Sequence, residues 1–464
     1  MTDDPYADAV PFDPAKARGP QPVGLPDNSD EALAQAFGKR HANDLRYIAA
    51  LGLWRVWDGV VWKRDETLEV IHLARLLCAE RAEQCTNKRD AVKVAGAQAI
   101  AAVERLARAD RRLAATVDQW DQDAMLLNTP DGGVCDLRTG VTRPAERGDY
   151  MTKMTAVAPG GDCPLWLDFL KRATDGDDDL QTYLQRMVGY VLTASTREHA
   201  IFFVHGPSAT SKTKFVEVIS GMLGDYAAVA PIEAFMASRS ERHPTDLAGL
   251  VGARLVAATE TEKDRRWAEA RIKQLSGGDA ITARLMRQDF FTYTPTFKLL
   301  FAGNHRPGIR DADAALRRRM HLIPFNVVIP ESDRDPDIGA KLEVEWPGIL
   351  RWAIDGGLSW QADGLAPPGK VVAAVDEYFV AEDILGRWIE ERCKCDEDLT
   401  CTTAALFSDW KDWAVVAGEY PGSARRLSVS LQERGFHRWR QPGTGARGFR
   451  GVTLKPSAPQ DEPL

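Results

Sequence analysis

Apolar and polar positions follow helical spacing in some segments of the chain and extended spacing in others. Two short aromatic and β-branched runs flank an Asp-Gly pair within residues 54–62, which predicts a β-hairpin closed by a two-residue turn. Residues 67–87 and 91–118 carry helical patterns, and residues 126–143 return to short strands and glycine-containing turns. We therefore expect a small N-terminal α+β domain over residues 31–160, without a catalytic constellation.

A second helical part follows this domain. Apolar positions between residues 164 and 193 share one helix face: Leu180, Tyr183, Leu184, Met187 and Val191. Aspartates at 177–179 stand before or in the first turn, where negative charge favours the helix dipole. The spacing predicts a helical collar over residues 161–197.

Three apolar strand runs come next, at residues 201–204, 253–258 and 297–302, with helical and turn segments between them. Strands that alternate with helices indicate an α/β domain, which we place at residues 198–345. Each of these runs is followed by polar residues, so the carboxyl ends of the strands are where we expect the chemistry.

The segment 205–213 has the order that a phosphate-binding loop needs: strand, glycine-containing turn, Lys-Thr, helix. In such a loop backbone N–H groups and the helix N-terminus cradle phosphates, the lysine reaches the β/γ oxygens, and the threonine hydroxyl takes Mg²⁺. The expected ATP-binding residues are Gly206, Ser208, Ser211, Lys212 and Thr213. The pattern has glycine where this chain has Ser211, so a positive φ there would cost on the order of 1–2 kcal/mol. The alternative is an ordinary Ser/Thr-rich turn that caps a helix.

Polar side chains also follow the other two strands. The second strand runs into Glu260 and Glu262, and a carboxylate at such a strand end holds Mg²⁺ or polarises the attacking water. Asn304 follows the third strand, where it can reach the γ-phosphate or position the water. The arginine cluster at 317–319 can act on the nucleotide of the next subunit. The alternatives are solvated acidic residues and a structural arginine face.

Residues 281–291 predict a hairpin whose tip carries Arg284 and Arg287. Arginines on a hairpin that faces the central channel of a ring would grip backbone phosphates without reading the base sequence. An exposed surface hairpin without this role is the alternative.

The last part of the chain combines helices, strands and basic residues. A helical stretch over residues 371–392 lies in a linker at 346–400, and two helical patterns at 402–417 and 423–434 then precede two strand runs around a Pro-Gly turn. Helix, helix and two-stranded wing is a winged-helix arrangement, which we place at 401–456 with DNA as its partner. The expected contacts are Arg425, Arg426, Arg447 and Arg450. A basic packing module without a DNA role is the alternative.

The composition of the chain limits its cellular compartment and its partners. The 464 residues carry a net charge of −8, so the overall charge does not indicate a nucleic-acid binder, yet residues 421–455 hold eight Lys/Arg and one acid. Seven cysteines and the lack of a long apolar run predict a cytoplasmic protein with no membrane partner. Residues 1–30 and 457–464 are expected to be tails, the first of them disordered. Three cysteines lack a fourth ligand at zinc-site spacing, so no metal is expected at Cys393, Cys395 and Cys401.

Several stretches together resemble the helicase part of phage, plasmid and poxvirus-type primase–helicases, which are hexameric AAA+ motors of helicase superfamily three. These stretches are TREH (196–199), RHPTDLAG (242–249), ETE (260–262), RW (266–267), GGD (277–279), RQDFF (287–291), AGNHRP (302–307) and RRRM (317–320). The resemblance spans residues ~45–455 and implies an α/β fold, namely an AAA+ P-loop motor between the N-terminal α+β and collar region and a C-terminal winged helix.

The resemblance implies an ATP-dependent replicative DNA helicase of a phage, prophage island or plasmid, inside a bacterial host cell. Such a protein works as a homohexamer, moves 3′→5′ and unwinds DNA at an origin or fork, with ATP and Mg²⁺ as cofactors. Its partners would be single- and double-stranded DNA and a separate primase or polymerase. The resemblance implies that Lys212 and Thr213 bind the nucleotide and Mg²⁺, and that Glu260 and Glu262 form the acidic pair, with Glu260 on Mg²⁺. It also implies that Asn304 is the sensor and that Arg319 or Arg318 is the arginine finger acting in trans. Arg287 is the implied contact with DNA in the channel.

Two departures from the family pattern matter. The phosphate loop has Ser208, Thr210 and Ser211 where the family has Gly, Asn and Gly. The residues ahead of the first hairpin are also too few for a primase domain, so we expect no priming activity. The first departure motivates a second hypothesis, a DNA-binding replication initiator or interference protein whose ATPase motor is inactive. A third is a ring that binds nucleotide only to assemble.

Overall fold

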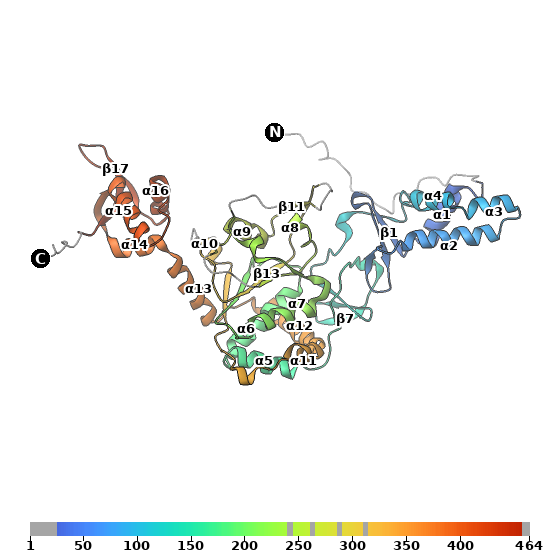
Figure 1. Ribbon diagram of the computed structural model, residues 1–464, viewed down its shortest axis with the longest axis horizontal. Helices are drawn as coiled ribbons and strands as arrows, with labels where there is room; N and C mark the ends of the chain where they lie inside the picture. The colour runs from blue at the N-terminus through green and yellow to red at the C-terminus, as the bar shows by residue number, and fades with distance from the viewer. Residues whose placement is uncertain (1–25, 239–244, 260–264, 285–289, 310–313, 457–464) are drawn as a thin grey trace. The chain divides into compact units, whose positions relative to one another are not determined.

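The computed structural model describes residues 26–238, 245–259, 265–284, 290–309 and 314–456 (Figure 1). The chain divides into two compact units. The first unit contains residues up to 307 together with 318–372, and the second contains 308–317 together with 373 onward. The architecture is mixed α/β with a parallel sheet in the first unit, as the sequence predicts.

The N-terminal part of the first unit holds a sheet in the order β3-β2-β1-β4 with helices packed beside it. Its elements are α1 (Asp30–Arg40), β1 (Leu45–Ile48), β2 (Leu53–Trp57), β3 (Trp62–Arg64), α2 (Glu69–Glu83), α3 (Lys88–Val94), α4 (Ala97–Ala107) and β4 (Ala114–Ala115). The predicted hairpin is confirmed, because β2 and β3 are antiparallel with Trp57 opposite Trp62. The two-residue turn is wrong: Asp58 accepts hydrogen bonds from the backbone N–H groups of Val60 and Val61 and closes a longer loop.

The single helix predicted over residues 91–118 is also wrong. The helical pattern is interrupted at Gly96, whose extended backbone begins α4, and α4 ends at Ala107. Ala114 and Ala115 form a short strand that pairs in parallel with Tyr47 and Ile48 of β1. A sheet edge therefore overrides the helical propensity of alanine here.

A second small sheet follows, made of β5 (Leu126–Thr129), β6 (Gly133–Asp136) and β7 (Val141–Pro144) in antiparallel order. These strands confirm the strand-and-turn prediction for residues 126–143. Next come α5 (Pro164–Ala173) and α6 (Asp178–Leu192). The predicted apolar face of α6 is buried, and the Asp177 side chain caps the helix by accepting from the N–H of Leu180.

Three glycines let α6 approach α12 (Trp346–Asp363) at backbone distance. A Cβ added at Gly189 would collide with the backbone of Gly356 and Gly357, and one added at Gly356 would collide with the carbonyl of Gln185. We call Gly189, Gly356 and Gly357 the glycine seam. It fixes two helices against each other more closely than side chains would permit.

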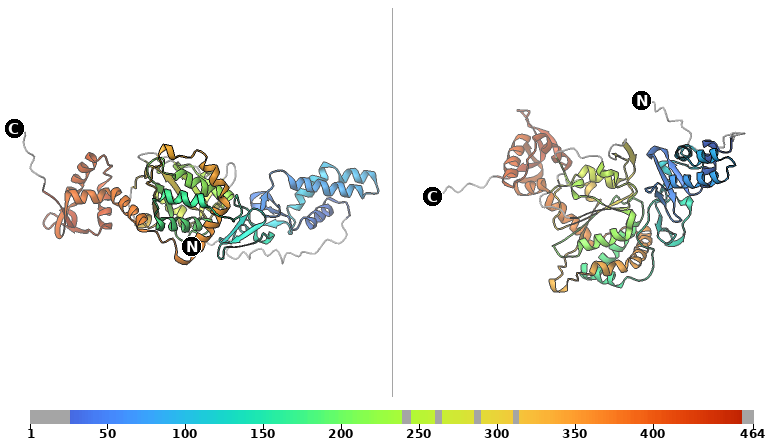
Figure 2. Two further views of the ribbon diagram at one scale, coloured as in Figure 1. Left: turned by 90° about the horizontal axis from the view of Figure 1, so that it is seen from below. Right: turned by 45° about the vertical axis from the view of Figure 1, so that its right-hand side comes forward.

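The central sheet has the order β14-β8-β13-β10-β9, and all its neighbouring strands are parallel. Its strands are β8 (Ile201–His205), β9 (Ala227–Val229), β10 (Leu255–Thr259), β13 (Lys298–Gly303) and β14 (Met320–Pro324). The helices between them are α7 (Lys212–Leu223), α8 (Thr245–Ala248) and α9 (Glu269–Gly277), and α11 (Ile338–Val344) follows β14. Helices α6 and α7 both contact α12, and α7 contacts the strands (Figures 1 and 2).

Both faces of this sheet are apolar, which explains the continuous apolar runs in the sequence. Phe202 and Val204 point into the core shared with α6 and α7. On the opposite face, Phe301 packs against Phe235 and Trp267 at ring distances of 5.0 and 4.9 Å.

Two buried cations hold the C-terminus of α6 against the sheet. The Arg254 guanidinium donates to the carbonyls of Leu192 and Leu126, and the Lys298 ammonium donates to the carbonyl of Thr193. Both cations therefore sit at the negative end of the helix dipole, and burial lowers the pKa of each. Arg254 and Lys298 lie at the amino ends of β10 and β13, at the edge of the sheet opposite to the one where these strands end.

Two histidines of the central sheet, His205 of β8 and His321 of β14, should make the protein less stable in mild acid. Burial lowers the pKa of His205 and of His321 to about 4, and the charges of Arg306 and Lys212 add to the shift at His205. The unfolded chain then takes up protons first as the pH falls, so stability is flat above pH ~6.5 and decreases between about 6.5 and 4. Each histidine contributes at most about 3 kcal/mol.

Urea unfolding of the wild type and of His321→Gln at several pH values measures this effect. Glutamine can keep the hydrogen bond that His321 makes to the Tyr183 hydroxyl at 2.8 Å, but it does not titrate. The variant should lose part of the acid dependence. An equally steep loss of stability in the variant would contradict the assignment to His321.

The second unit contains an antiparallel sheet in the order β15-β17-β16. Its elements are α10 (Ala314–Arg317), α14 (Ile384–Arg392), β15 (Cys393–Thr402), α15 (Thr403–Val416), α16 (Ala424–Glu433), β16 (His437–Arg440) and β17 (Arg447–Leu454). The two predicted helices and two predicted strands of this region are confirmed. Strand β15 was not predicted.

The helix predicted over residues 371–392 is two helices, α13 (Gly369–Glu382) and α14, separated at Asp383. The Asp383 carboxylate caps α14 by accepting from the N–H of Gly386 and pairs with Arg434. A capping aspartate within a helical pattern ends one helix and begins the next. Among the described helices, none is long and apolar enough to cross a membrane.

Candidate nucleotide-binding site

The segment between β8 and α7 forms a compact loop at the carboxyl edge of the sheet. Gly206 has φ +152°, and a Cβ there would collide with the carbonyl oxygen of Phe325, so glycine is required for this turn. The loop is tied to the following chain by a 2.9 Å hydrogen bond from the N–H of Ile329 to the carbonyl of Ala209. Strand, loop and helix are therefore placed as a phosphate-binding loop requires.

The Lys212 ammonium lies inside this loop. It donates to the carbonyl of Gly206 and to the Thr210 hydroxyl, both at 2.9 Å, and to the carbonyl of Pro207. The side chain is buried, and burial lowers the pKa of its amine. A desolvated cation held only by neutral oxygens would be stabilised by an anion of phosphate type. Thr213 lies exposed in the first turn of α7, beside Lys212.

Ser211 adopts a left-handed conformation, φ +66° and ψ 1°, and Ala209 does so as well, with φ +62°. The sequence argument that Ser211 stands where glycine would be unstrained is therefore confirmed. Two such residues store strain of about 1–2 kcal/mol each in the loop.

Glycine at position 211 should relieve this strain. We expect Ser211→Gly to stabilise the protein by about 1 kcal/mol, seen as a higher melting temperature, and to leave the loop able to bind nucleotide. Ser208→Gly is the matched control, because Ser208 does not have a positive φ and glycine there should be neutral or slightly destabilising. A lower melting temperature for Ser211→Gly would show that the serine makes a compensating contact.

Asn304 meets the loop from the neighbouring strand. In the ladder Gly303 of β13 is opposite His205 of β8, and the next residue, Asn304, donates from Nδ2 to the Ser208 hydroxyl at 3.2 Å. Two of the sequence-predicted residues are thus brought together. Thr259, the last residue of β10, is opposite Ala302, whereas Glu260 and Glu262 lie outside the described residues.

The arginine cluster divides into different environments. Arg319 donates to the carbonyl of Lys273 at 2.7 Å and to the Ser276 hydroxyl at 3.1 Å, which ties it to the end of α9 in its own chain. Arg318 is exposed, with no ion pair to any of the described residues. Arg317 pairs with Asp376 at 2.7 Å within the second unit. Sequence spacing alone could not separate the three.

The predicted hairpin of residues 281–291 is present as β11 (Ile281–Arg284) and β12 (Phe290–Tyr293), paired antiparallel. Arg284 ends β11 and its guanidinium lies 4.8 Å from the centre of the Phe290 ring. Arg287 lies outside the described residues. The hairpin itself is confirmed, and Arg284 is at the end of the strand that leads to its tip.

A cavity of about 250 Å³ adjoins the loop and was not foreseen from the sequence. Ala209 and Ser211 of the loop contribute one side and Phe169 of α5 another. The remaining lining residues are Leu165, Asp168, Arg172, Lys214, Ile329, Asp333, Arg334, Asp335 and Ile338. The cavity combines apolar walls with polar groups at its rim, as small-molecule sites do.

The predicted DNA contacts of the second unit also differ from one another. Arg425 is exposed at the start of α16, while Arg426 is half-buried. Arg447 is exposed and lies directly opposite Arg440 in the β16–β17 ladder, a pair not noted from the sequence. Arg450 pairs with Asp398 of β15 at 3.0 Å, so its charge is offset within the unit.

The loop that contains Gly206 and Lys212 lies between a strand of a parallel sheet and the following helix, and an asparagine from the adjacent strand contacts it. Phosphate-binding loops have this arrangement. Residues 34–175 match the family described as D5 N terminal like, and residues 204–319 match a family of unknown function (DUF5906). The N-terminal α+β part and the central sheet thus match separate families.

Two viral proteins are distantly similar to parts of this chain. The chain is 24% identical over 274 residues to "Putative helicase 022R" of Frog virus 3, covering 54% of this chain and 28% of the relative. It is 27% identical over 159 residues to a helicase-named protein of Acanthamoeba polyphaga mimivirus, covering 34% of this chain and 16% of the relative. The aligned part therefore spans about a quarter or less of the length of these relatives. These relatives carry helicase names, and each similarity covers only part of both chains.

Solved structures of low sequence identity share the fold. The apo structure of the C-terminal region of NrS-1 superimposes with a TM-score of 0.50 at 10% identity, covering 91% of this chain and 99% of that one. A second form of the same region gives a TM-score of 0.51 at 9% identity and the same coverage. At these identities the likeness concerns the fold alone.

Proposed function

We propose that this chain is an ATP-dependent DNA helicase motor that works as a ring, most simply a homohexamer, in the replication of a mobile element. The observation that carries the proposal is the convergence of Lys212, Asn304 and the Gly206 turn at one edge of the parallel sheet. This is the geometry that a nucleoside triphosphate needs.

The residues present fit ATP and Mg²⁺. Gly206 permits the tight turn of the loop against Phe325, and Lys212 supplies a desolvated cation. The Thr213 hydroxyl is exposed at the helix N-terminus, so Thr213 together with Glu260 would hold Mg²⁺, which when bound neutralises charge that develops on the phosphate oxygens. Glu260 or Glu262 would orient and deprotonate the attacking water, and Asn304 would position it. Arg318, exposed beside β14, would reach the nucleotide of the next subunit.

The cavity next to the loop would take the nucleoside half of ATP. Its lining includes Ala209 and Ser211, so an occupant would be continuous with phosphates bound at the loop. The Phe169 ring and the aliphatic side chains of Leu165 and Ile329 suit a flat base.

DNA would be held in two places. Arg284 and Arg287 on the hairpin would grip phosphates of a single strand in the ring's channel. The second unit would act as a winged helix on duplex DNA, with α16 and the β16–β17 wing as its contacts. Arg440 and Arg447, directly opposite each other, support this assignment, because like charges in one ladder destabilise the pair unless an anion lies between them.

A second candidate function is a DNA-binding initiator whose motor no longer turns over. The left-handed Ser211 favours it, since strain in the loop works against tight nucleotide binding. The intact Lys212 and Asn304 contacts favour an active motor instead.

ATP hydrolysis by the purified chain, with and without single-stranded DNA, tests the proposal. We expect DNA-stimulated turnover that falls at least about 100-fold in Lys212→Ala, because the charge on the transferring phosphoryl group loses its nearest cation. Lys88→Ala, at an exposed lysine of α3 that lines neither cavity, is the matched control and should keep turnover within a fewfold of wild type. DNA binding without turnover in the wild type would favour the initiator.

A further inference from the structure

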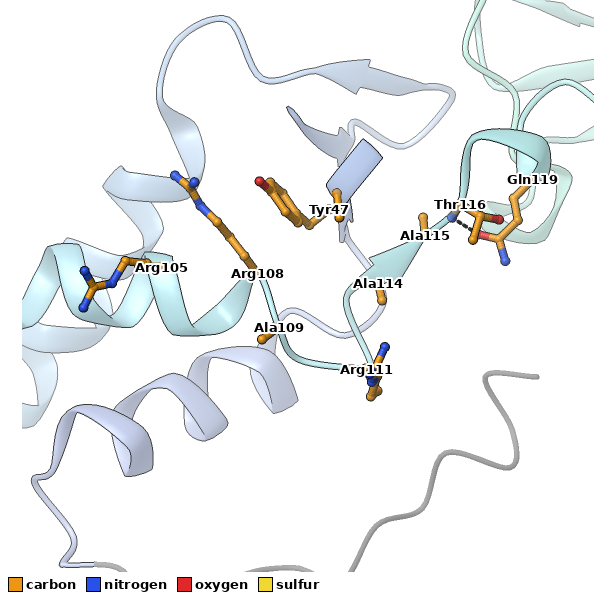
Figure 3. Close-up of a pocket in the computed structure, with 10 residues that line it drawn as sticks. Tyr47, Arg105, Arg108, Ala109, Arg111, Ala114, Ala115, Thr116 and Gln119 are labelled. Atoms are coloured by element: carbon orange, nitrogen blue, oxygen red, sulfur yellow. Dashed lines mark hydrogen bonds between the residues drawn. The ribbon is translucent and has the colours of Figure 1, made fainter. Parts of the chain in front are cut away.

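The N-terminal part of the first unit contains a cavity of about 540 Å³ that has no role in the motor. Figure 3 shows Arg105 and Arg108 projecting from α4, the Tyr47 ring beside Arg108, and Arg111 on the loop before β4. The remaining lining residues are Ala49, Ala109, Ala114, Ala115, Thr116 and Gln119, so no carboxylate lines the cavity, whose walls all lie in the described part of the chain.

The Tyr47 ring is held in place by a network behind it. The Arg108 guanidinium lies 5.4 Å from the ring centre and forms two 2.9 Å hydrogen bonds with the Glu104 carboxylate. That carboxylate is buried and also accepts from the Trp54 indole at 2.6 Å. Trp54 in turn packs on Tyr47 with ring centres 4.9 Å apart. These contacts hold the Tyr47 ring in place, and Glu104 offsets the charge of Arg108.

Two further arginines, Arg105 and Arg111, line the cavity. Arg105 is exposed and forms no ion pair in the described structure, and Arg111 is exposed at the opposite wall. Arg105 and Arg108 are three residues apart on α4, so the positive groups follow one line from the helix to the edge strand β4. A polyanion that runs along this line would be held by its backbone.

We propose that this cavity binds single-stranded nucleic acid, with a base against Tyr47 and phosphates on Arg105 and Arg111. An aromatic face among arginines is the arrangement that holds unpaired strands without sequence preference. In a duplex the flat faces of the bases are stacked on each other, so Tyr47 could not reach them. An acidic peptide would pair with the arginine charges but would have no flat group to pack against the Tyr47 ring. The proposed function enters this inference only through the choice of DNA as the probe.

Photocrosslinking of the full chain to an oligothymidylate that carries 5-iododeoxyuridine tests the assignment. We expect cross-linked peptides that contain Tyr47 or residues 105–119, besides those of the motor and the second unit. In Arg105→Ala/Arg111→Ala the yield at these peptides should fall at least about fivefold. The slope of log affinity against log salt should decrease by about 0.7 for each phosphate that the variant no longer binds. Arg89→Ala, an exposed arginine of α3 outside the cavity, is the matched control and should leave both unchanged.

Tyr47→Phe should retain the cross-link and Tyr47→Ala should lose it, and circular dichroism establishes that each variant is folded. Cross-links confined to other parts of the chain, unchanged yield in the double arginine variant, or preferential protection by free thymidine monophosphate would each overturn the proposal. ATP turnover without DNA separates the two hypotheses. If the wild-type chain never hydrolyses ATP but cross-links at Tyr47, the proposed motor function is contradicted and the proposed nucleic-acid site is supported. We expect Lys212→Ala to abolish turnover and to retain the cross-link at Tyr47.

Discussion

ATP turnover is expected to fall about 1,000-fold or more when Arg318 is replaced by alanine, because an arginine supplied in trans contributes this much to phosphoryl transfer. The choice of Arg318 follows from its surroundings. Arg319 is bound to the end of α9 by hydrogen bonds to Lys273 and Ser276, whereas Arg318 is exposed. A residue that reaches a neighbouring subunit must be free to leave its own.

Arg319→Ala should behave differently. Its loss leaves the Lys273 carbonyl and the Ser276 hydroxyl without this donor, which costs about 1–3 kcal/mol and lowers the melting temperature. Steady-state hydrolysis and thermal denaturation of both variants separate the two roles, with Arg317→Ala as a third, exposed comparison.

Rings assembled from two different variants test whether Arg318 acts on the nucleotide of a neighbouring subunit. An Arg318→Ala subunit keeps its own phosphate loop and a Lys212→Ala subunit keeps its arginine, so mixtures of the two should regain part of the turnover that each lacks alone. No recovery on mixing, or full activity of Arg318→Ala, would remove Arg318 from the role in trans.

The second large expected effect is a loss of folding stability at the glycine seam. Gly189→Ala should destabilise the protein by about 3 kcal/mol or more, because the added methyl group would overlap the backbone of α12. Flexible side chains can move aside for a small addition, but a helix backbone at this distance must shift as a whole. Chemical denaturation measures the loss directly.

Gly369→Ala is the matched control for Gly189→Ala. Gly369 also lies in a helix, but a Cβ there meets nothing within 4 Å, so the substitution should be neutral or slightly stabilising. If both substitutions had the same small effect, the close approach of α6 and α12 would be in doubt.

Much of the fold could be predicted where local pattern and tertiary role agree. The apolar spacing of α6 and three of the five strands of the central sheet, β8, β10 and β13, followed from the hydrophobic pattern, because those faces are buried as the pattern requires. The strained backbone at Ser211 followed from the spacing of the loop alone.

The errors arose where tertiary contacts override local preference. Ala114 pairs with Tyr47 at a sheet edge although its sequence surroundings favour a helix, and Asp383 interrupts a continuous helical pattern by capping. The sequence did not predict strand β15, because half of its side chains are exposed and three are acidic, so it shows no apolar alternation.

The candidate site shows the same difference between what local sequence determines and what tertiary contacts determine. Lys212 and Asn304 could be identified because loop spacing and strand ends fix where they must lie. The difference between Arg318 and Arg319 depends on a carbonyl of Lys273, 46 residues away, which no local pattern records. The two cavities depend on side chains from several elements and were invisible for the same reason.

The glycine seam has a consequence for how the chain is made. The α6 surface that holds Gly189 is completed only by Gly356 and Gly357, and the N-terminus of α5 is capped by the carboxylate of Glu345, which accepts from the N–H groups of Leu165 and Trp166. At typical synthesis rates the ribosome needs about ten to thirty seconds to reach α12 after α6 has been made. During that interval the apolar face of α6 lacks its natural cover. Chains cut short before α12 should therefore aggregate or recruit chaperones, whereas chains that extend past it can close.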